Sequence, residues 1–186
     1  MKRDGFRALA YVERGKGRLV SRNGNTFKRF APLGTEIAGA LRGVRNAILD
    51  GEVVCLDGDG RPLFNALLYR RSEPCFVAFD CLWLDGRDLR RLPLIERKRV
   101  LRGIVPRRRP CVQFLPHVHR RGVDLFAQVV QRDLEGVVAK LRQAPYDLVG
   151  GTSPWVKIKN REYSQAVGRH EQFDGFQGEK RLARRA

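Results

Sequence analysis

Strand-like segments separated by tight turns constrain the fold of this chain more than any other feature. The clearest is residues 75–84, Cys-Phe-Val-Ala-Phe-Asp-Cys-Leu-Trp-Leu, which Asp85-Gly86 follows as a turn. Apolar, β-branched and aromatic runs bounded by such turns are typical of strands. The same pattern predicts further strands over residues 6–12, 17–21, 47–56, 136–141 and 155–159.

Helices are predicted between these strands. Apolar residues at helical spacing predict one over residues 94–104. Thr35 is expected to cap another that runs to about Val44, and Asp124 to cap a third through Arg132. The segment 107–109, three arginines bracketed by prolines, predicts an exposed basic loop. Together these elements predict a mixed α+β domain with largely antiparallel sheets.

The charge of the chain points to a polyanionic partner. Among 186 residues, Lys and Arg number 37 and Asp and Glu number 20, which gives a formal net charge of +17. Such a surface attracts nucleic acid through counterion release, although a merely basic protein is the alternative. No apolar run approaches the roughly 18 residues of a membrane span, and we expect no secretory leader. The four cysteines form no C-x-x-C pair, so reduced thiols in a cytoplasmic protein are expected rather than zinc.

The first candidate for chemistry is Lys2, in the segment Lys-Arg-Asp-Gly-Phe-Arg. It places an amine beside a tight turn at Asp4-Gly5 and a phosphate-binding cation at Arg7. A lysine is a nucleophile in its neutral form, which neighbouring cations favour. Most lysines are solvated surface charges, so this segment needs further partners to support a catalytic interpretation.

Three later segments offer such partners. Arg22, in Ser-Arg-Asn-Gly, presents a planar fork suited to a phosphate, or belongs to an ordinary turn. Glu52 closes an Asp-Gly-Glu triplet that interrupts an apolar strand. It requires a ribose hydroxyl or a metal as partner, or a local arginine if the triplet forms a β-bulge. Phe79 can stack on a purine or pack in the core.

Two more segments carry charges near the end of the chain. Glu135 stands at the entrance of the strand Gly-Val-Val-Ala-Lys and suits Mg²⁺, unless it points to water. Strand periodicity places Lys157 and Lys159 on one face, about 7 Å apart. An anion such as a phosphate would relieve their repulsion. The alternative is an edge strand in which lysines prevent aggregation.

In this order, the six segments resemble the motifs of ATP-dependent DNA ligase catalytic domains. The resemblance runs from about residue 2 to residue 160. The segment Phe-Asp-Cys-Leu-Trp-Leu-Asp-Gly-Arg-Asp-Leu at 79–89 is similar to the ligase domain of bacterial end-joining ligases. The resemblance implies a covalent nucleotidyltransferase (ATP-grasp-like) fold, in which antiparallel sheets are flanked by helices. It also implies ATP and Mg²⁺ (or Mn²⁺) as cofactors.

The resemblance further implies a role for each candidate. Lys2 would attack the α-phosphate of ATP to form a lysyl-AMP, which passes to the 5′-phosphate of nicked or broken DNA. Asp4 and Gly5 would support Lys2, and Glu135 would bind the metal. The nucleotide would be held by Arg7, Glu52, Phe79, Lys157 and Lys159. Arg22 would bind the phosphate of the DNA.

The resemblance also sets expectations for domain organisation. Residues 1–163 would form the adenylation domain, and residues 164–186 a basic, flexible tail. Relative to the family, we expect a truncated N-terminus and no OB-fold, so a separate DNA-clamping or end-joining partner would complete sealing. We expect a cytoplasmic protein at the bacterial nucleoid, with no membrane partner. The alternative function is a catalytically impaired, DNA-binding remnant.

Overall fold

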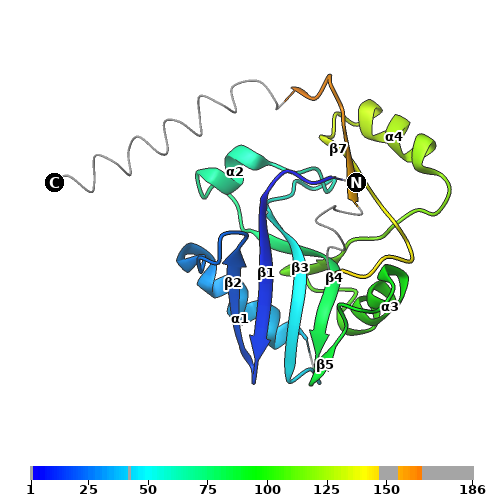
Figure 1. Cartoon of the computed structure of the whole chain (residues 1–186). Helices are drawn as coiled ribbons and strands as arrows, with labels where there is room; N and C mark the ends of the chain where they lie inside the picture. Colours follow the sequence, from blue (N-terminus) through cyan, green and yellow to red (C-terminus); the bar gives the residue numbers. More distant parts are fainter. Residues whose placement is uncertain (1, 42, 147–154, 165–186) are drawn as a thin grey trace.

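A six-stranded, mostly antiparallel sheet forms the centre of the molecule in the computed structural model, which describes residues 2–41, 43–146 and 155–164 (Figure 1). Its strands follow the order β2-β1-β3-β4-β5, and β6 pairs with β4 in parallel. Their bounds are β1 Phe6–Glu13, β2 Lys16–Ser21, β3 Asn46–Val54, β4 Cys75–Leu84, β5 Arg87–Asp88 and β6 Val112–Phe114. A separate two-stranded sheet pairs β7, Gly136–Lys140, with β8, Trp155–Lys159.

Helices cover one face of the large sheet. Helix α1, Ala31–Ala40, packs on β1 and β2, and helix α3, Leu94–Ile104, packs on β4. Both contribute to one apolar cluster, for example through Ile37 and Leu101. In the described residues there are also a short α2, Phe64–Leu68, a 3₁₀ turn, Lys28–Phe30, and α4, Gly122–Gln131, which packs on β7. No helix in this part of the chain is long and apolar enough to cross a membrane.

The predicted helix ends were wrong in three places, one of which is the C-terminal end of α1, at Ala40 rather than about Val44. Helix α1 begins four residues before Thr35, whose Oγ1 donates a hydrogen bond to the carbonyl of Ala31 (3.3 Å). Proline in the first turn starts this helix, because its φ is already helical and its missing N–H costs no hydrogen bond there. Asp124 is not the N-cap of α4: it lies inside the first turn, and Arg121 is the N-cap residue. The Asp124 carboxylate accepts a hydrogen bond from Arg121 Nε.

Register irregularities shape β3 and β4 where polar residues cross the sheet. Asp50 pairs with Asp80 and the next residue, Gly51, pairs with Ala78, so Phe79 has no partner on β3. This β-bulge lets Asp80 stay fully buried while Phe79 is only half-buried. The polar triplet at 50–52 lies within β3, inside the strand predicted at 47–56, and the β-bulge that was the alternative interpretation of this triplet occurs between Asp50 and Gly51 in the pairing with β4.

The small sheet meets the large one near Phe79 of β4 and the segment that precedes β1. Lys2 forms an antiparallel bridge with Gly136, the first residue of β7. The ring of Trp155 in β8 lies edge-on to the ring of Phe79 in β4, with centroids 6.3 Å apart. Figure 1 shows β7 and α4 beyond the end of the large sheet at which β1 begins. The two sheets thus enclose the start of the chain.

Candidate nucleotide-binding site

A cavity of about 660 Å³ lies where the two sheets meet. Most of the residues singled out from the sequence line it: Lys2, Arg7, Arg22, Glu52, Phe79 and Lys157. They come from five different strands or the segments next to them, so the fold collects residues spread over 155 positions of the chain.

Lys2 joins the first motif to the segment that begins at Glu135. Its backbone N–H donates to the carbonyl of Gly136 (2.6 Å), and its Nζ forms an ion pair with Glu135 Oε1. The Glu135 side chain is only 8% exposed, whereas that of Lys2 is 23% exposed and lines the cavity. The expected water-facing alternative for Glu135 is therefore wrong: the carboxylate holds the lysine.

Asp4 and Gly5 fix the position of the backbone next to Lys2. Asp4 is buried, and its Oδ2 accepts a hydrogen bond from the Tyr163 hydroxyl (3.2 Å). At Gly5 a Cβ would lie 2.2 Å from the carbonyl oxygen of Val53, closer than real Cβ atoms come. The Asp-Gly pair thus lets the backbone pass tightly over β3 immediately after Lys2, which positions the amine at the cavity wall.

Glu52 is directed to the same cavity from β3, opposite Arg7 in the β1–β3 register. Burial raises its pKa from 4.5 to about 7, although the charges of Lys2 and Arg7 oppose that shift and Glu135 adds to it. A carboxyl group that titrates near neutral pH and faces a cavity is a recognised sign of a functional site.

Arg7 is engaged by a carboxylate that the sequence interpretation did not assign. Its Nε and Nη2 donate to Oδ1 and Oδ2 of Asp50, at 3.1 and 2.6 Å. The Tyr146 hydroxyl donates to the same Oδ2 (2.9 Å), and Asp50 has no exposed surface. The guanidinium also lies 4.7 Å from the ring centre of Trp155. Arg7 therefore borders the cavity as the partly exposed partner of a buried carboxylate, and the local arginine expected for Glu52 pairs with Asp50 instead.

The aromatic wall of the cavity contains a lysine that was also missed. Lys140 Nζ lies 4.2 Å from the ring centre of Phe79 and 3.7 Å from that of Trp155. It has no hydrogen-bond partner in the described part of the chain. Burial lowers its pKa to about 8, against the opposing effect of two buried aspartates. The only signal in the sequence was its place five residues after Glu135, at the end of an apolar strand.

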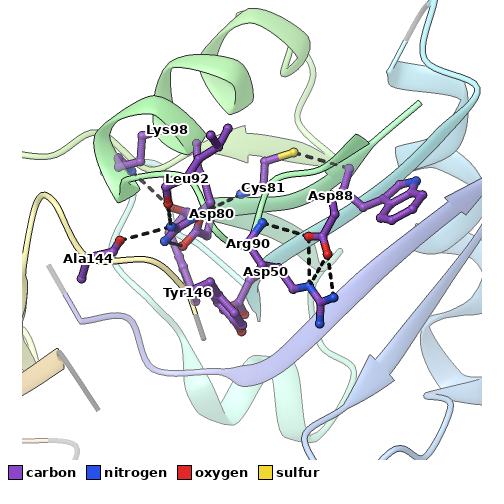
Figure 2. Close-up of polar contacts among 12 residues, drawn as sticks. Asp50, Asp80, Cys81, Asp88, Arg90, Leu92, Lys98, Ala144 and Tyr146 are labelled. Carbon is purple, nitrogen blue, oxygen red and sulfur yellow. Dashed lines mark hydrogen bonds and ion pairs between the residues drawn. The ribbon is translucent and has the colours of Figure 1, made fainter. Parts of the chain in front are cut away.

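A second buried network surrounds Asp80, the residue after Phe79 in β4 (Figure 2). Arg97 Nε and Nη2 donate to Oδ1 and Oδ2 of Asp80, at 2.8 and 2.9 Å, and neither side chain is exposed. Arg97 Nη1 also donates to the carbonyls of Leu92 and Ala144. Lys98 Nζ donates to the carbonyls of Phe79 (3.3 Å) and Leu115 (2.9 Å), and burial lowers its pKa to about 8. An aspartate inside an apolar strand signalled a buried partner, but not its identity.

The two lysines of β8 are placed differently. Lys157 lines the cavity, whereas Lys159 is exposed and lies outside its lining. Strand periodicity places Val156 and Ile158 on the other face of β8 from the two lysines. These side chains remain 61% and 43% exposed. Arg22 is exposed at the cavity rim. The tail expected at 164–186 lies, apart from Ser164, outside the described residues.

Comparison with known proteins identifies this arrangement. Residues 1–159 match the family described as "ATP dependent DNA ligase domain". The chain belongs to this family. The ligase domain is 33% identical over 166 residues to the "Multifunctional non-homologous end joining protein LigD" of Pseudomonas aeruginosa, covering 86% of this chain and 19% of that protein. It is 35% identical over 174 residues to a "Probable DNA ligase" of Streptomyces coelicolor, covering 85% of this chain and 34% of that protein.

Solved structures agree on the fold of this ligase domain. A "mycobacterial DNA ligase D complexed with ATP and MES" superposes with a TM-score of 0.74 and 31% identity, over 86% of this chain and 52% of that one. The expected nucleotidyltransferase fold, with antiparallel sheets and flanking helices, is thereby confirmed. The chain spans a fifth to a third of the relatives named above and about half of this solved chain.

The ligase cavity has the chemistry that ATP and a divalent metal require. An aromatic ring, a buried carboxylate and several cations suit a base, a ribose and a triphosphate respectively. Within the described residues, no group of three or more His, Cys, Asp or Glu side chains forms a dedicated metal cage. Glu135 and Glu52 are nevertheless close enough to interact electrostatically. One or two carboxylates plus substrate phosphates are the usual Mg²⁺ environment, so the residues fit that ion.

Proposed function

We propose that this ligase domain forms a covalent adenylate on Lys2 and transfers the AMP to DNA. One observation carries the proposal: the Lys2 amine reaches the wall of a cavity that also presents Phe79, Glu52 and Lys157. Membership of the ATP-dependent ligase family and the similarity to a ligase structure bound to ATP support it.

The first step joins Lys2 to the nucleotide. The neutral Nζ attacks the α-phosphorus of ATP, a P–N bond forms, the bond to the bridging oxygen breaks, and pyrophosphate leaves. The ammonium of Lys2 must first lose a proton. That proton would pass to solvent, to which the Lys2 side chain is 23% exposed, and the neutral amine would leave its pair with Glu135 to reach the phosphorus. Lys157 supplies positive charge where the leaving pyrophosphate would lie.

Other residues would hold the nucleotide in place. Phe79 would stack on adenine and Glu52 would accept a hydrogen bond from the ribose. Glu135, with Glu52 nearby, would hold Mg²⁺ (or Mn²⁺) together with ATP phosphates. When bound, this ion supplies positive charge that offsets the charge of the phosphates. Arg22 at the rim would contact the DNA phosphate.

Four more residues have less direct roles. Lys159 would contact phosphates from outside the described cavity lining. Arg7, already held by Asp50, would act on the nucleotide through its position beside the aromatic wall. Asp4 and Gly5 would keep Lys2 in place.

The second and third steps would act on DNA. The AMP passes from Lys2 to a DNA 5′-phosphate, and a 3′-hydroxyl then displaces AMP to seal a nick or a break. The relatives named for end joining make repair of broken DNA the best-supported setting, with the protein in the bacterial cytoplasm at the nucleoid. Sealing would use a separate DNA-clamping or end-joining partner.

Transfer of label tests the proposal. Purified protein incubated with α-³²P-ATP and Mg²⁺ should acquire label that resists alkali but is released by acid, as expected for a phosphoramidate. Lys2→Ala should abolish labelling. Lys16→Ala, which removes an exposed lysine from the start of β2, should label like the wild type. An unlabelled wild type that still binds DNA would instead support the DNA-binding remnant.

A further inference from the structure

A second hollow, separate from the nucleotide cavity, lies between the C-terminal end of α3 and β6. Its volume is about 380 Å³. Its charged lining residues are Arg102, near the end of α3, and Arg107, Arg108 and Arg109 in the loop that follows. Phe114 forms its apolar wall. The hollow therefore concentrates four guanidinium groups around a small volume.

The lining of the hollow contains no carboxylate: among the described residues, no Asp or Glu belongs to it. None of the ion pairs found within the described residues involves any of the four arginines. All four side chains belong to exposed residues. Like charges held together in this way repel each other, and an anion with several oxygens at regular spacing would relieve that repulsion.

The hollow adjoins the nucleotide cavity through one aromatic ring. Lys98 and Arg102 stand one helical turn apart on α3 and both approach the ring of Phe114. Lys98 Nζ lies 4.6 Å and Arg102 Cζ 5.1 Å from the ring centre. Lys98 lines the nucleotide cavity and Arg102 lines the hollow. Phe114 thus contacts one cation that lines the nucleotide cavity and one that lines the hollow, which places the two sites side by side.

The location in the sheet agrees with this placement. Val112 pairs with Phe76 near the start of β4, and β1 begins opposite the end of β3 at the same end of the sheet. Lys2 precedes β1, so the arginine loop and the nucleophile lie toward one end of the molecule.

We propose that this hollow, the arginine groove, binds the phosphodiester backbone of the nucleic-acid substrate away from the reacting end. The inference rests on the proposed function for the identity of the polyanion. Guanidinium groups recognise phosphate whatever molecule carries it. The alternative ligand of the groove is therefore a free phosphate or the triphosphate of ATP. The groove would add affinity without sequence preference, because it reads backbone charge only.

A charge-matched pair of triple variants tests the groove. Arg107→Gln/Arg108→Gln/Arg109→Gln removes three charges from it. The control replaces Arg14, Arg45 and Arg87 with Gln. These residues are exposed and lie at the opposite end of the sheet, where the Arg14 N–H donates to the Arg45 carbonyl and the Arg45 N–H donates to Asp85 Oδ1. Both variants lower the net charge equally, so any difference between them reports on location. Thermal unfolding shows whether each is folded.

The readout is the affinity for a nicked duplex as a function of salt, with α-³²P-ATP labelling measured in parallel without DNA. The groove variant should bind DNA at least about tenfold more weakly at 0.1 M salt. Its slope of log K against log salt should be shallower by about 2.7, the value for three lost phosphate contacts. The control should stay close to the wild type. Arg107→Lys/Arg108→Lys/Arg109→Lys should restore most of the affinity.

The outcomes separate the groove from the proposed enzyme. A groove variant with wild-type affinity and slope overturns the inference and leaves adenylation untouched. Reduced labelling in the absence of DNA would assign the groove to the ATP phosphates and also overturn it. A wild type that never labels but loses DNA affinity on loss of the groove would overturn the proposed function and retain the groove.

Discussion

The buried pair of Asp80 and Arg97 should be among the most sensitive positions for stability in this domain. Arg97→Met removes two charge-assisted hydrogen bonds, of 2.8 and 2.9 Å, from a carboxylate with no exposed surface. In this variant Asp80 still accepts a hydrogen bond from the backbone N–H of Cys81 (2.9 Å). The carbonyls of Leu92 and Ala144 lose the donor that Arg97 supplied. Breaking a buried pair from one side costs about 3–5 kcal/mol, a large share of the roughly 5–15 kcal/mol that stabilises a domain.

The chain contains its own control for this substitution. Asp88 and Arg90 form a similar forked pair, with Arg90 Nη2 2.6 Å from Asp88 Oδ2, but at the surface, where both side chains are exposed (Figure 2). Arg90→Met should leave stability within experimental error, because water replaces the lost contact. Because both pairs have similar geometry, the difference between the two variants in the free energy of unfolding reports the effect of burial.

Urea denaturation followed by circular dichroism provides the measurement. The midpoint for Arg97→Met should fall sharply with an unchanged m-value, and that for Arg90→Met should not move. Asp80→Leu/Arg97→Met, which removes both charges, should recover part of the loss. Stability of Arg97→Met within about 1 kcal/mol of the wild type would refute the reasoning, since it would show that Asp80 finds water or another partner.

Two further predictions concern residues at the cavity. Burial raises the pKa of Glu52 from 4.5 to about 7, so between these values the folded protein retains a proton that the unfolded chain releases. Stability should therefore fall as pH rises through this window. Glu52→Gln should gain roughly 2–3 kcal/mol relative to the wild type between pH 5 and pH 8, measured by denaturation, and a constant gap would contradict the assignment. Gly5→Ala should lose about 1–3 kcal/mol, because the new Cβ meets a backbone oxygen at 2.2 Å. Gly58→Ala, with no atom within 4 Å of its Cβ position, is the control, and equal effects of the two substitutions would argue against the close approach.

Elements set by local chemistry were predicted well. The strand at 75–84 and the helix at 94–104 match β4 and α3 in the structure. The strand is a long apolar run that ends at the turn Asp85-Gly86. The helix has apolar residues at helical spacing and ends just before a proline. Helix α1 was placed late, because Thr35 resembles a cap while the first-turn proline is the actual start. Here two local signals compete, and only the packing of the helix on β1 and β2 shows which one holds.

The candidate site was predicted unevenly for a related reason. Residue type and order were sufficient to single out Lys2, Glu52 and Phe79, since each carries chemistry that its local segment does not use. The partners were not accessible in this way. Asp80 signals that some cation must lie near it, but Arg97 is 17 residues away on a helix, and only packing selects it from the many arginines of this chain.

Local sequence is enough to specify the strands, the α+β class, the strong positive charge and the order of the ligase motifs, because these depend on side-chain chemistry and short-range periodicity. Tertiary structure alone decides that Glu135 holds Lys2, that Arg7 turns to Asp50, and that a bulge releases Phe79 toward the cavity. Burying a charge is costly unless a partner of opposite charge is buried with it. Which partner that is depends on how distant segments pack together.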